Sequence, residues 1–278
     1  MAARASNLVV RLVTAAIGVP VILAILYFGP AWAFYAVVLA AALVGAHELL
    51  GMTHPSDRPT RIIGVVISAL ASATVYFQAA NPRALIAVLT LVPLAGPMVT
   101  LGRLGALETA AFRACALGFG PLFVAVPLTL LAVMRRTLEP GIGAGFALLA
   151  IGLAWFADTG AYFAGRWFGR RKLYPAVSPN KTVEGALGGL AAGVVWAVVA
   201  SLSYLRGALP LAHAVVLGLI AGGLGQVGDL SESLLKRSTG VKDSGAIVPG
   251  HGGILDRVDA VIVTSVVVYL YAQWALAA

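Results

Sequence analysis

The residues best suited to chemistry are carboxylates and cationic side chains gathered in two polar stretches, 158–184 and 229–259, of an otherwise apolar chain. The acids of these stretches are Asp158, Glu184, Asp229, Glu232, Asp243, Asp256 and Asp259. Carboxylates hold Mg²⁺, usually together with substrate phosphates, and Lys and Arg bind phosphate oxygens. A stretch that carries both kinds of side chain therefore predicts a metal-nucleotide or metal-pyrophosphate site.

In the second stretch the acids are expected near helix ends. If a helix starts near Leu255, Asp256 and Asp259 stand at i and i+3 on one face. Acids at a helix N-terminus also suit the helix dipole, and Asp229 with Glu232 has the spacing of a capping box, so a structural explanation stays open. It does not account for the cationic residues of the same loop, which are Lys236, Arg237, Lys242, His251 and Arg257.

Glycines lie just before Asp256, at Gly250, Gly252 and Gly253. Residues without Cβ let backbone N–H groups approach an anion and adopt positive φ, while an ordinary glycine-rich turn is the alternative. His251 is interpreted as a turn or hydrogen-bonding residue rather than a metal ligand, because no second His lies nearby.

The first stretch contains the sequence SPNK, which favours a helix start. Ser178 is expected as the N-cap and Pro179 as the first residue of the next helix. Free backbone N–H groups and Lys181 then share one helix end, an arrangement that binds phosphate, although capping alone also explains Ser178. The basic run at 170–172 is typical of an orientation signal that contacts lipid headgroups.

The elements that must position these residues are membrane spans. The chain of 278 residues is 60% hydrophobic and 11% charged, and its mean hydropathy of +0.95 is typical of an integral membrane protein. A span needs roughly 20 apolar residues. We therefore predict an all-α polytopic fold of nine transmembrane helices, near 8–28, 32–50, 62–80, 84–101, 110–134, 141–157, 185–205, 209–228 and 260–277.

The distribution of Lys and Arg predicts the topology. With a cytoplasmic N-terminus, most Lys and Arg residues fall on the cytoplasmic side, as the positive-inside rule requires. Both polar stretches are then cytoplasmic loops, and the first span is an uncleaved helix. We expect about six spans in residues 1–157 and a catalytic transmembrane region in 158–278.

These motifs resemble those of the phosphatidate cytidylyltransferase family, also called CDP-diacylglycerol synthases. The C-terminal signature of the family corresponds to Ser233, Lys236, Arg237, Lys242, Asp243, Gly245, Pro249, His251, Gly252, Gly253, Asp256, Arg257 and Asp259. A second family stretch matches 158–169 and then Ser178, Pro179, Lys181, Thr182, Glu184 and Gly185. The motifs cover about 158–260. The first half resembles the family only in hydropathy and in the start RLVTAAIGVPVI, and Glu48 lacks the aromatic neighbours often found in the family.

The resemblance implies that CTP and phosphatidic acid form CDP-diacylglycerol and pyrophosphate in a reaction that depends on Mg²⁺. It leaves the presence of a second cation open. It also implies a homodimer in a bacterial inner membrane, with its active site facing the cytoplasm. Asp229 and Asp256 are the implied metal ligands, with Asp243 and Asp259 next. The implied phosphate-binding residues are Lys181, Lys236, Arg237, Lys242 and Arg257. The further substrate-binding candidates are Asp158, Ser178, Glu184, Ser233, His251, Gly252 and Gly253.

Other functions are less consistent with the sequence. A secondary transporter would place ionisable residues at mid-membrane depth in two related halves, and no repeat is visible. The sequence has no basic patch in a soluble stretch, so it gives no indication of nucleic-acid binding. The closer alternative is another CTP-dependent membrane enzyme, either a lipid-alcohol kinase or an isoprenoid-lipid cytidylyltransferase. Near the end of the second span, Glu48 and His47 are interpreted as a helix-end pair that meets water, with a functional pair as the alternative. His54 is expected to be solvated.

Overall fold

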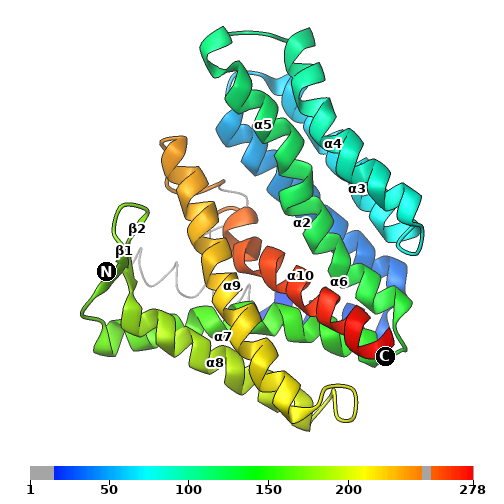
Figure 1. Cartoon of the computed structure of the whole chain (residues 1–278), viewed down its shortest axis with the longest axis vertical. Helices are drawn as coiled ribbons and strands as arrows, with labels where there is room; N and C mark the ends of the chain where they lie inside the picture. The colour runs from blue at the N-terminus through cyan, green and yellow to red at the C-terminus, as the bar shows by residue number, and fades with distance from the viewer. Residues whose placement is uncertain (1–15, 246–251, 278) are drawn as a thin grey trace. The chain divides into compact units, whose positions relative to one another are not determined.

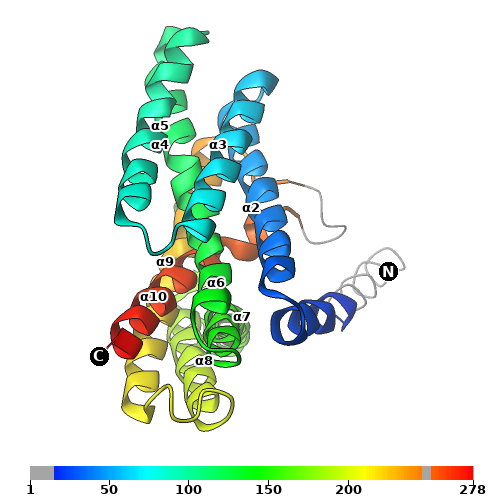
Figure 2. The ribbon, with the colours of Figure 1, turned by 90° about the vertical axis from the view of Figure 1, so that its right-hand side faces the viewer.

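The computed structural model describes residues 16–245 and 252–277 and is almost entirely helical. Eight helices of this described part are long and apolar enough to cross a membrane, which confirms the all-α polytopic prediction. The first predicted span is described only from Ala16, as the shorter apolar helix Ala16–Phe28. Its residues 8–15 lie outside the described part. The chain divides into two compact units, and Figures 1 and 2 show their helices.

Unit 1 comprises the chain up to Val133 together with Asp243–Arg257. Its elements are α2 (Ala31–Thr53), α3 (Arg58–Phe77), α4 (Pro82–Gly102), η1 (Leu107–Thr109), α5 (Ala110–Gly120), the π turn η2 (Pro121–Ala125), the first part of α6 (Val126–Thr137), and the start of α10 (Leu255–Ala277). Helices α2 to α5 run side by side in both views (Figures 1 and 2). The predicted span at 110–134 is one continuous apolar segment, interrupted by a π turn where Pro121 has no N–H to donate.

Buried polar groups join the helices of unit 1. Tyr35 of α2 stacks on Tyr76 of α3 with ring centroids 3.8 Å apart. Ser72 Oγ lies 3.3 Å from the Tyr35 hydroxyl and 2.7 Å from Thr129 Oγ1 of α6. Hydrogen bonds between helices satisfy polar groups that lipid cannot, so these contacts hold α2, α3 and α6 in register.

Unit 2 comprises Met134–Lys242 and Val258–Ala278. Its elements are α7 (Ile142–Phe168), the strands β1 (Lys172–Tyr174) and β2 (Ser178–Thr182), α8 (Val183–Leu202), α9 (Leu211–Ser238), and the remainder of α10. The strands form an antiparallel hairpin in which Tyr174 pairs with Ser178. Figure 1 shows this hairpin at the end of α7 and the start of α8, with α9 running across the α7–α8 pair.

Small residues bring α7 and α8 into close contact. A Cβ on Gly189 would lie 2.8 Å from the carbonyl oxygen of Ala157, and one on Gly185 would lie 2.9 Å from that of Ala161. Both distances are shorter than real Cβ contacts, so only glycine fits. This contact holds the hairpin, which precedes α8 directly, beside the end of α7.

Two predicted helix boundaries are wrong. The predicted sixth and eighth spans end at 157 and 228, but α7 continues to Phe168 and α9 to Ser238. Both polar stretches therefore begin as helix rather than loop, and Asp229 and Glu232 lie inside α9, so they form no capping box. Hydropathy reports where apolar residues end, whereas helical hydrogen bonding continues through any residues of adequate helix propensity.

The predicted start of the seventh helix is also wrong. Ser178 and Pro179 belong to β2, and Thr182 is the N-cap of α8, because its hydroxyl accepts a hydrogen bond from Gly185 N at 3.1 Å. Thr has the same capping chemistry as Ser, and the fixed φ of Pro179 suits an extended strand as well as a helix start. The prediction that α10 starts at Leu255 is confirmed.

Candidate functional site

Unit 2 contains a cavity of about 500 Å³ between the hairpin and the helices that flank it. The polar residues that line it are Asp158, Tyr162 and Arg166 of α7, Asn180, Lys181 and Thr182 of β2, and Gln226 and Asp229 of α9. Its volume lies in the range of small-molecule sites. Residues distant in the sequence therefore meet at one cavity, whose charged lining consists of two acids, Asp158 and Asp229, and two bases, Arg166 and Lys181.

The central contact of this cavity is an ion pair between Lys181 and Asp229. The side chains keep 29% and 23% of their surface exposed, respectively, so both remain accessible from the cavity. The hairpin carries Lys181 toward α9, which supplies Asp229. The structure thus brings together two residues that the sequence analysis assigned to phosphate and to metal.

Asp259 lies against α9 in the same unit. Its backbone oxygen would be 3.1 Å from a Cβ on Gly228, and its carboxyl group interacts electrostatically with Asp229, Asp158 and Glu232. Asp259 is buried, with 8% of its surface exposed. Three acids of α7 and α9 are therefore close enough to influence Asp259 of α10, and such clusters are costly near apolar surroundings unless cations compensate them.

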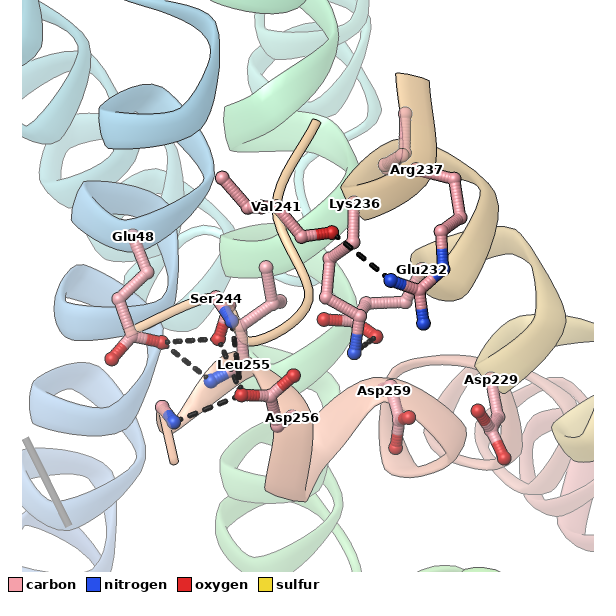
Figure 3. A network of polar contacts seen from close by, with 12 residues as sticks. Glu48, Asp229, Glu232, Lys236, Arg237, Val241, Ser244, Leu255, Asp256 and Asp259 are labelled. Carbon is pink, nitrogen blue, oxygen red and sulfur yellow. Dashed lines mark hydrogen bonds and ion pairs between the residues drawn. The ribbon is translucent and has the colours of Figure 1, made fainter. Parts of the chain in front are cut away.

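Further basic candidates in unit 2 are held by the protein itself. Lys236 pairs with the fully buried Glu232 one turn earlier, at 2.5 Å (Figure 3). Arg237 donates from Nε to the carbonyl of Val177 and from Nη1 to that of Val241, at 3.4 and 3.3 Å. Arg237 thereby connects α9 to the hairpin and to the turn that follows α9.

Glu184 stabilises the approach to the hairpin. Its Oε2 accepts hydrogen bonds from the backbone N–H groups of Arg170 and Arg171, at 3.0 and 3.2 Å. These contacts orient the basic run after α7. Glu184 therefore has hydrogen-bond partners within the protein. Two other predicted site residues differ in exposure: Ser233 is half-buried and Lys242 is exposed.

Unit 1 holds a second polar cluster at the start of α10, which we call the Glu48 cluster: Glu48, Ser244, Gly253, Ile254, Leu255 and Asp256. Figure 3 shows Glu48, Ser244, Leu255 and Asp256 of this cluster. Asp256 Oδ2 accepts hydrogen bonds from Ser244 N, Ser244 Oγ and Gly253 N, at 3.1, 3.0 and 2.9 Å. Gly252 has φ +80° and lies beside Asp256 and Asp243. These glycines therefore approach two protein carboxylates, Asp256 beside Gly252 and Glu48 beside Gly253.

Glu48 and Ser244 were missed as partners of this site. Glu48 retains only 4% of its surface exposed, so the interpretation of a helix-end acid that meets water is wrong. His54 is also buried, at 2% exposed, and desolvation, followed by the positive charge of Arg113, lowers its pKa below 6.5. One signal in the sequence could have identified Glu48 as a buried site residue: it is an acid at the end of an apolar span, where ionisable residues usually serve function.

Other predicted site residues are placed as follows. Arg257 and Asp243 are exposed, and Asp256 and Asp259 lie three residues apart on α10. Gly250 and His251 lie outside the described residues. Among those that are described, no group of three or more His, Cys, Asp or Glu side chains has the arrangement of a metal site.

Comparison with known proteins gives consistent similarities. The model of the Cytidylyltransferase family matches residues 9–275. The phosphatidate cytidylyltransferase of Bacillus subtilis (strain 168) is 45% identical over 134 residues, 48% of this chain and 49% of that protein. The protein of the same name from Haemophilus influenzae is 44% identical over 133 residues, 47% of this chain and 46% of that protein. The chain thus spans about half the length of the curated relatives it matches.

Proposed function

Because the chain belongs to the cytidylyltransferase family, we propose that it transfers CMP from CTP to phosphatidic acid, forming CDP-diacylglycerol and pyrophosphate. The relatives named phosphatidate cytidylyltransferase support this lipid acceptor. The observation that carries the proposal is the cavity of unit 2, where Lys181 and Asp229 meet beside the end of α7. We further propose a bacterial inner membrane location, a cytoplasm-facing site and a homodimer.

Charge repulsion is the first obstacle to this reaction. A lipid phosphate must approach a nucleotide triphosphate, and both are anions. Cationic side chains held in a partly dry site stabilise such a pair more strongly than they do in water. Lys181 is the cation within the cavity that is best placed for this role, because its ion pair with Asp229 already fixes its position.

The lipid phosphate acts as the nucleophile. A phosphate monoester has a second pKa near ~6, so it is substantially ionised near neutral pH. The reaction therefore needs no general base from the protein. Catalysis then consists of positioning and charge stabilisation, by analogy with phosphoryl transfer.

The ends of helices suit a reaction between a lipid and a nucleotide. The acyl chains of phosphatidic acid remain in hydrocarbon, while CTP arrives from water. Asp229 and Lys181 lie in α9 and β2, where a membrane-spanning helix and a polar hairpin meet. A cavity where the end of a spanning helix meets a polar hairpin would be accessible to the lipid from the bilayer and to CTP from water.

We propose Asp229 and Asp256 as ligands of Mg²⁺, with Asp243 and Asp259 as further candidates. Carboxylates suit this role, because Mg²⁺ takes one or two of them together with substrate phosphates and water. Asp256 is also oriented by three hydrogen bonds, as ligating carboxylates usually are. When bound, the ion would polarise the α-phosphoryl group and neutralise the leaving pyrophosphate.

Product analysis tests the proposed function. Purified protein receives CTP, phosphatidic acid and Mg²⁺, and lipid products are identified by mass while pyrophosphate is measured. We expect a lipid that gains CMP, with one pyrophosphate released for each. Release of CDP would instead identify a lipid-alcohol kinase. CMP transfer only to an isoprenoid lipid would identify an isoprenoid-lipid cytidylyltransferase.

A further inference from the structure

Glu48 is a buried carboxylate in the last turns of α2 to which the proposed function assigns no role. Burial of a charge is costly unless hydrogen bonds and partners compensate it. We propose that Glu48 is a positioning residue: it holds Ser244 and the start of α10 in place and thereby fixes the carboxylate of Asp256. The inference rests on the proposed function, in which Asp256 is a site residue.

A side chain from another helix, Glu48 of α2, caps the start of α10. Glu48 Oε1 accepts a hydrogen bond from Ile254 N at 3.1 Å. Its Oε2 accepts one from Leu255 N at 2.8 Å (Figure 3). Amides at a helix N-terminus have no partner within the helix, and a negative charge there is favoured by the helix dipole. Glu48 thus satisfies two amides at the position where α10 begins.

Ser244 bridges Glu48 and Asp256. Ser244 Oγ lies 3.1 Å from Glu48 Oε2 and 3.0 Å from Asp256 Oδ2. A hydroxyl has a single proton, so it donates to one carboxylate at a time, while Ser244 N donates to Asp256 throughout. Movement of Glu48 would therefore be transmitted through Ser244 to Asp256.

Two glycines, Gly245 and Gly253, lie against the Glu48 carboxylate. A Cβ on Gly245 would lie 2.5 Å from Glu48 Oε1. A Cβ on Gly253 would overlap both Ser244 Oγ and Glu48 Oε2. The backbone on both sides of the cluster thus lacks a Cβ where it meets the carboxylate, which is what close approach requires.

Substitution of Glu48 by Gln is the sharpest test, because it keeps the size and removes one acceptor. Both carboxylate oxygens accept backbone hydrogen bonds, whereas the NH₂ group of Gln only donates. Whichever way the amide is turned, one donor then faces another donor. Glu48→Gln should therefore loosen the start of α10 without creating a cavity.

The experiment compares wild type, Glu48→Gln and the control Glu108→Gln, which alters an exposed acid of η1. We expect faster hydrogen exchange at the Ile254 and Leu255 amides of Glu48→Gln. We also expect kcat to fall by about 10- to 100-fold, with KM for CTP within about threefold of wild type, because positioning acts on the transition state. Glu108→Gln should match wild type in all three measurements.

A second variant, Ser244→Ala, keeps the test decisive if Glu48→Gln fails to fold. It should lower kcat while protection at Ile254 and Leu255 is retained, since Glu48 still caps α10. Wild-type kcat in the folded variants would overturn the inference, as would unchanged exchange at both amides in Glu48→Gln. If wild type itself forms no CDP-diacylglycerol, the proposed function fails, and amide exchange alone then decides whether Glu48 anchors α10.

Discussion

At the scale of single residues, the protein compensates many of its charges internally. Glu232 pairs with Lys236, and Lys181 pairs with Asp229. A charge removed from water is destabilising unless a partner remains, so these pairs keep each side chain in one place before any substrate arrives. A substrate phosphate or a cation would bind at groups that are already ordered.

Asp256→Asn is expected to abolish most turnover while the protein still inserts and folds. The substitution removes a negative charge from the proposed metal site but leaves the apolar spans unchanged. We expect kcat to fall by about 100-fold or more, and Mn²⁺ binding, measured by electron paramagnetic resonance, to weaken in parallel. Wild-type rates in a folded Asp256→Asn variant would contradict the assignment.

The matched control for Asp256→Asn is Lys172→Gln, which also changes one charge. Lys172 is exposed in β1 and lies in the basic run interpreted as a topology signal. We expect its turnover to remain close to that of wild type. A large loss there would indicate that the hairpin strand itself binds substrate.

Asp57, which lies between two spans, makes the stability of the protein depend on pH. Desolvation raises its pKa, but hydrogen bonds from Arg103 and Thr60 outweigh it and lower the pKa from 3.8 to about 2. Because the folded-state pKa is depressed, the stabilisation is complete above 3.8 and is lost as pH falls toward about 2. The difference in unfolding temperature between wild type and Asp57→Asn, measured in detergent, should shrink across this window. A difference that persists at the acidic end would disagree with the pairing.

At the scale of elements, the hairpin between α7 and α8 determines how Lys181 is presented. The strand β2 leads directly into α8, whose N-cap is Thr182. The glycine contacts between α7 and α8 then fix where the hairpin lies. Lys181 thus owes its position to helix packing as well as to its own strand.

Thr182→Ala should destabilise unit 2 through loss of the α8 cap. Removal of an N-cap hydroxyl typically costs about 1 kcal/mol, which should lower the unfolding temperature measured in detergent. Ser178→Ala is the matched comparison, because Ser178 lies in β2 and caps no helix. Equal destabilisation by both variants, or a larger effect at Ser178, would contradict the assignment of the cap.

At the scale of the whole molecule, eight apolar helices of the described residues define an integral membrane protein. Two compact units are built from them, and the short segment Asp243–Arg257 belongs to unit 1 although its neighbours in sequence belong to unit 2. The sequence predicted a division at residue 157, with the catalytic residues in the part that follows it. It stays a prediction, as do the cytoplasmic N-terminus and the dimer.

The topology can be measured with single cysteines in a Cys115→Ser background. Helix α8 separates the hairpin from the turn at 203–210, and its 20 residues span about 30 Å at ~1.5 Å per residue. We expect Lys172→Cys to react with an impermeant thiol reagent only from the cytoplasmic side, and Arg206→Cys only from the opposite side. Labelling of both from one side would show that α8 does not cross the membrane.

The sequence alone determined the spans and the family. A bilayer demands long apolar segments whose backbone hydrogen bonds are satisfied internally, so hydropathy identified the eight helices at nearly correct centres. The order of polar residues in 158–260 was specific enough to indicate the family, which the match over residues 9–275 confirms. Both signals depend on residues that are close together in the chain.

Only the tertiary structure decided which polar groups meet. Glu48 binds Leu255 N although 207 positions separate them, and no local pattern predicts a partner at that distance. Likewise, Thr182 rather than Ser178 caps α8, because the hairpin holds Ser178 opposite Tyr174. Hydropathy and motif spacing describe a chain in one dimension, whereas the partners of a buried carboxylate are set by the packing of helices in three.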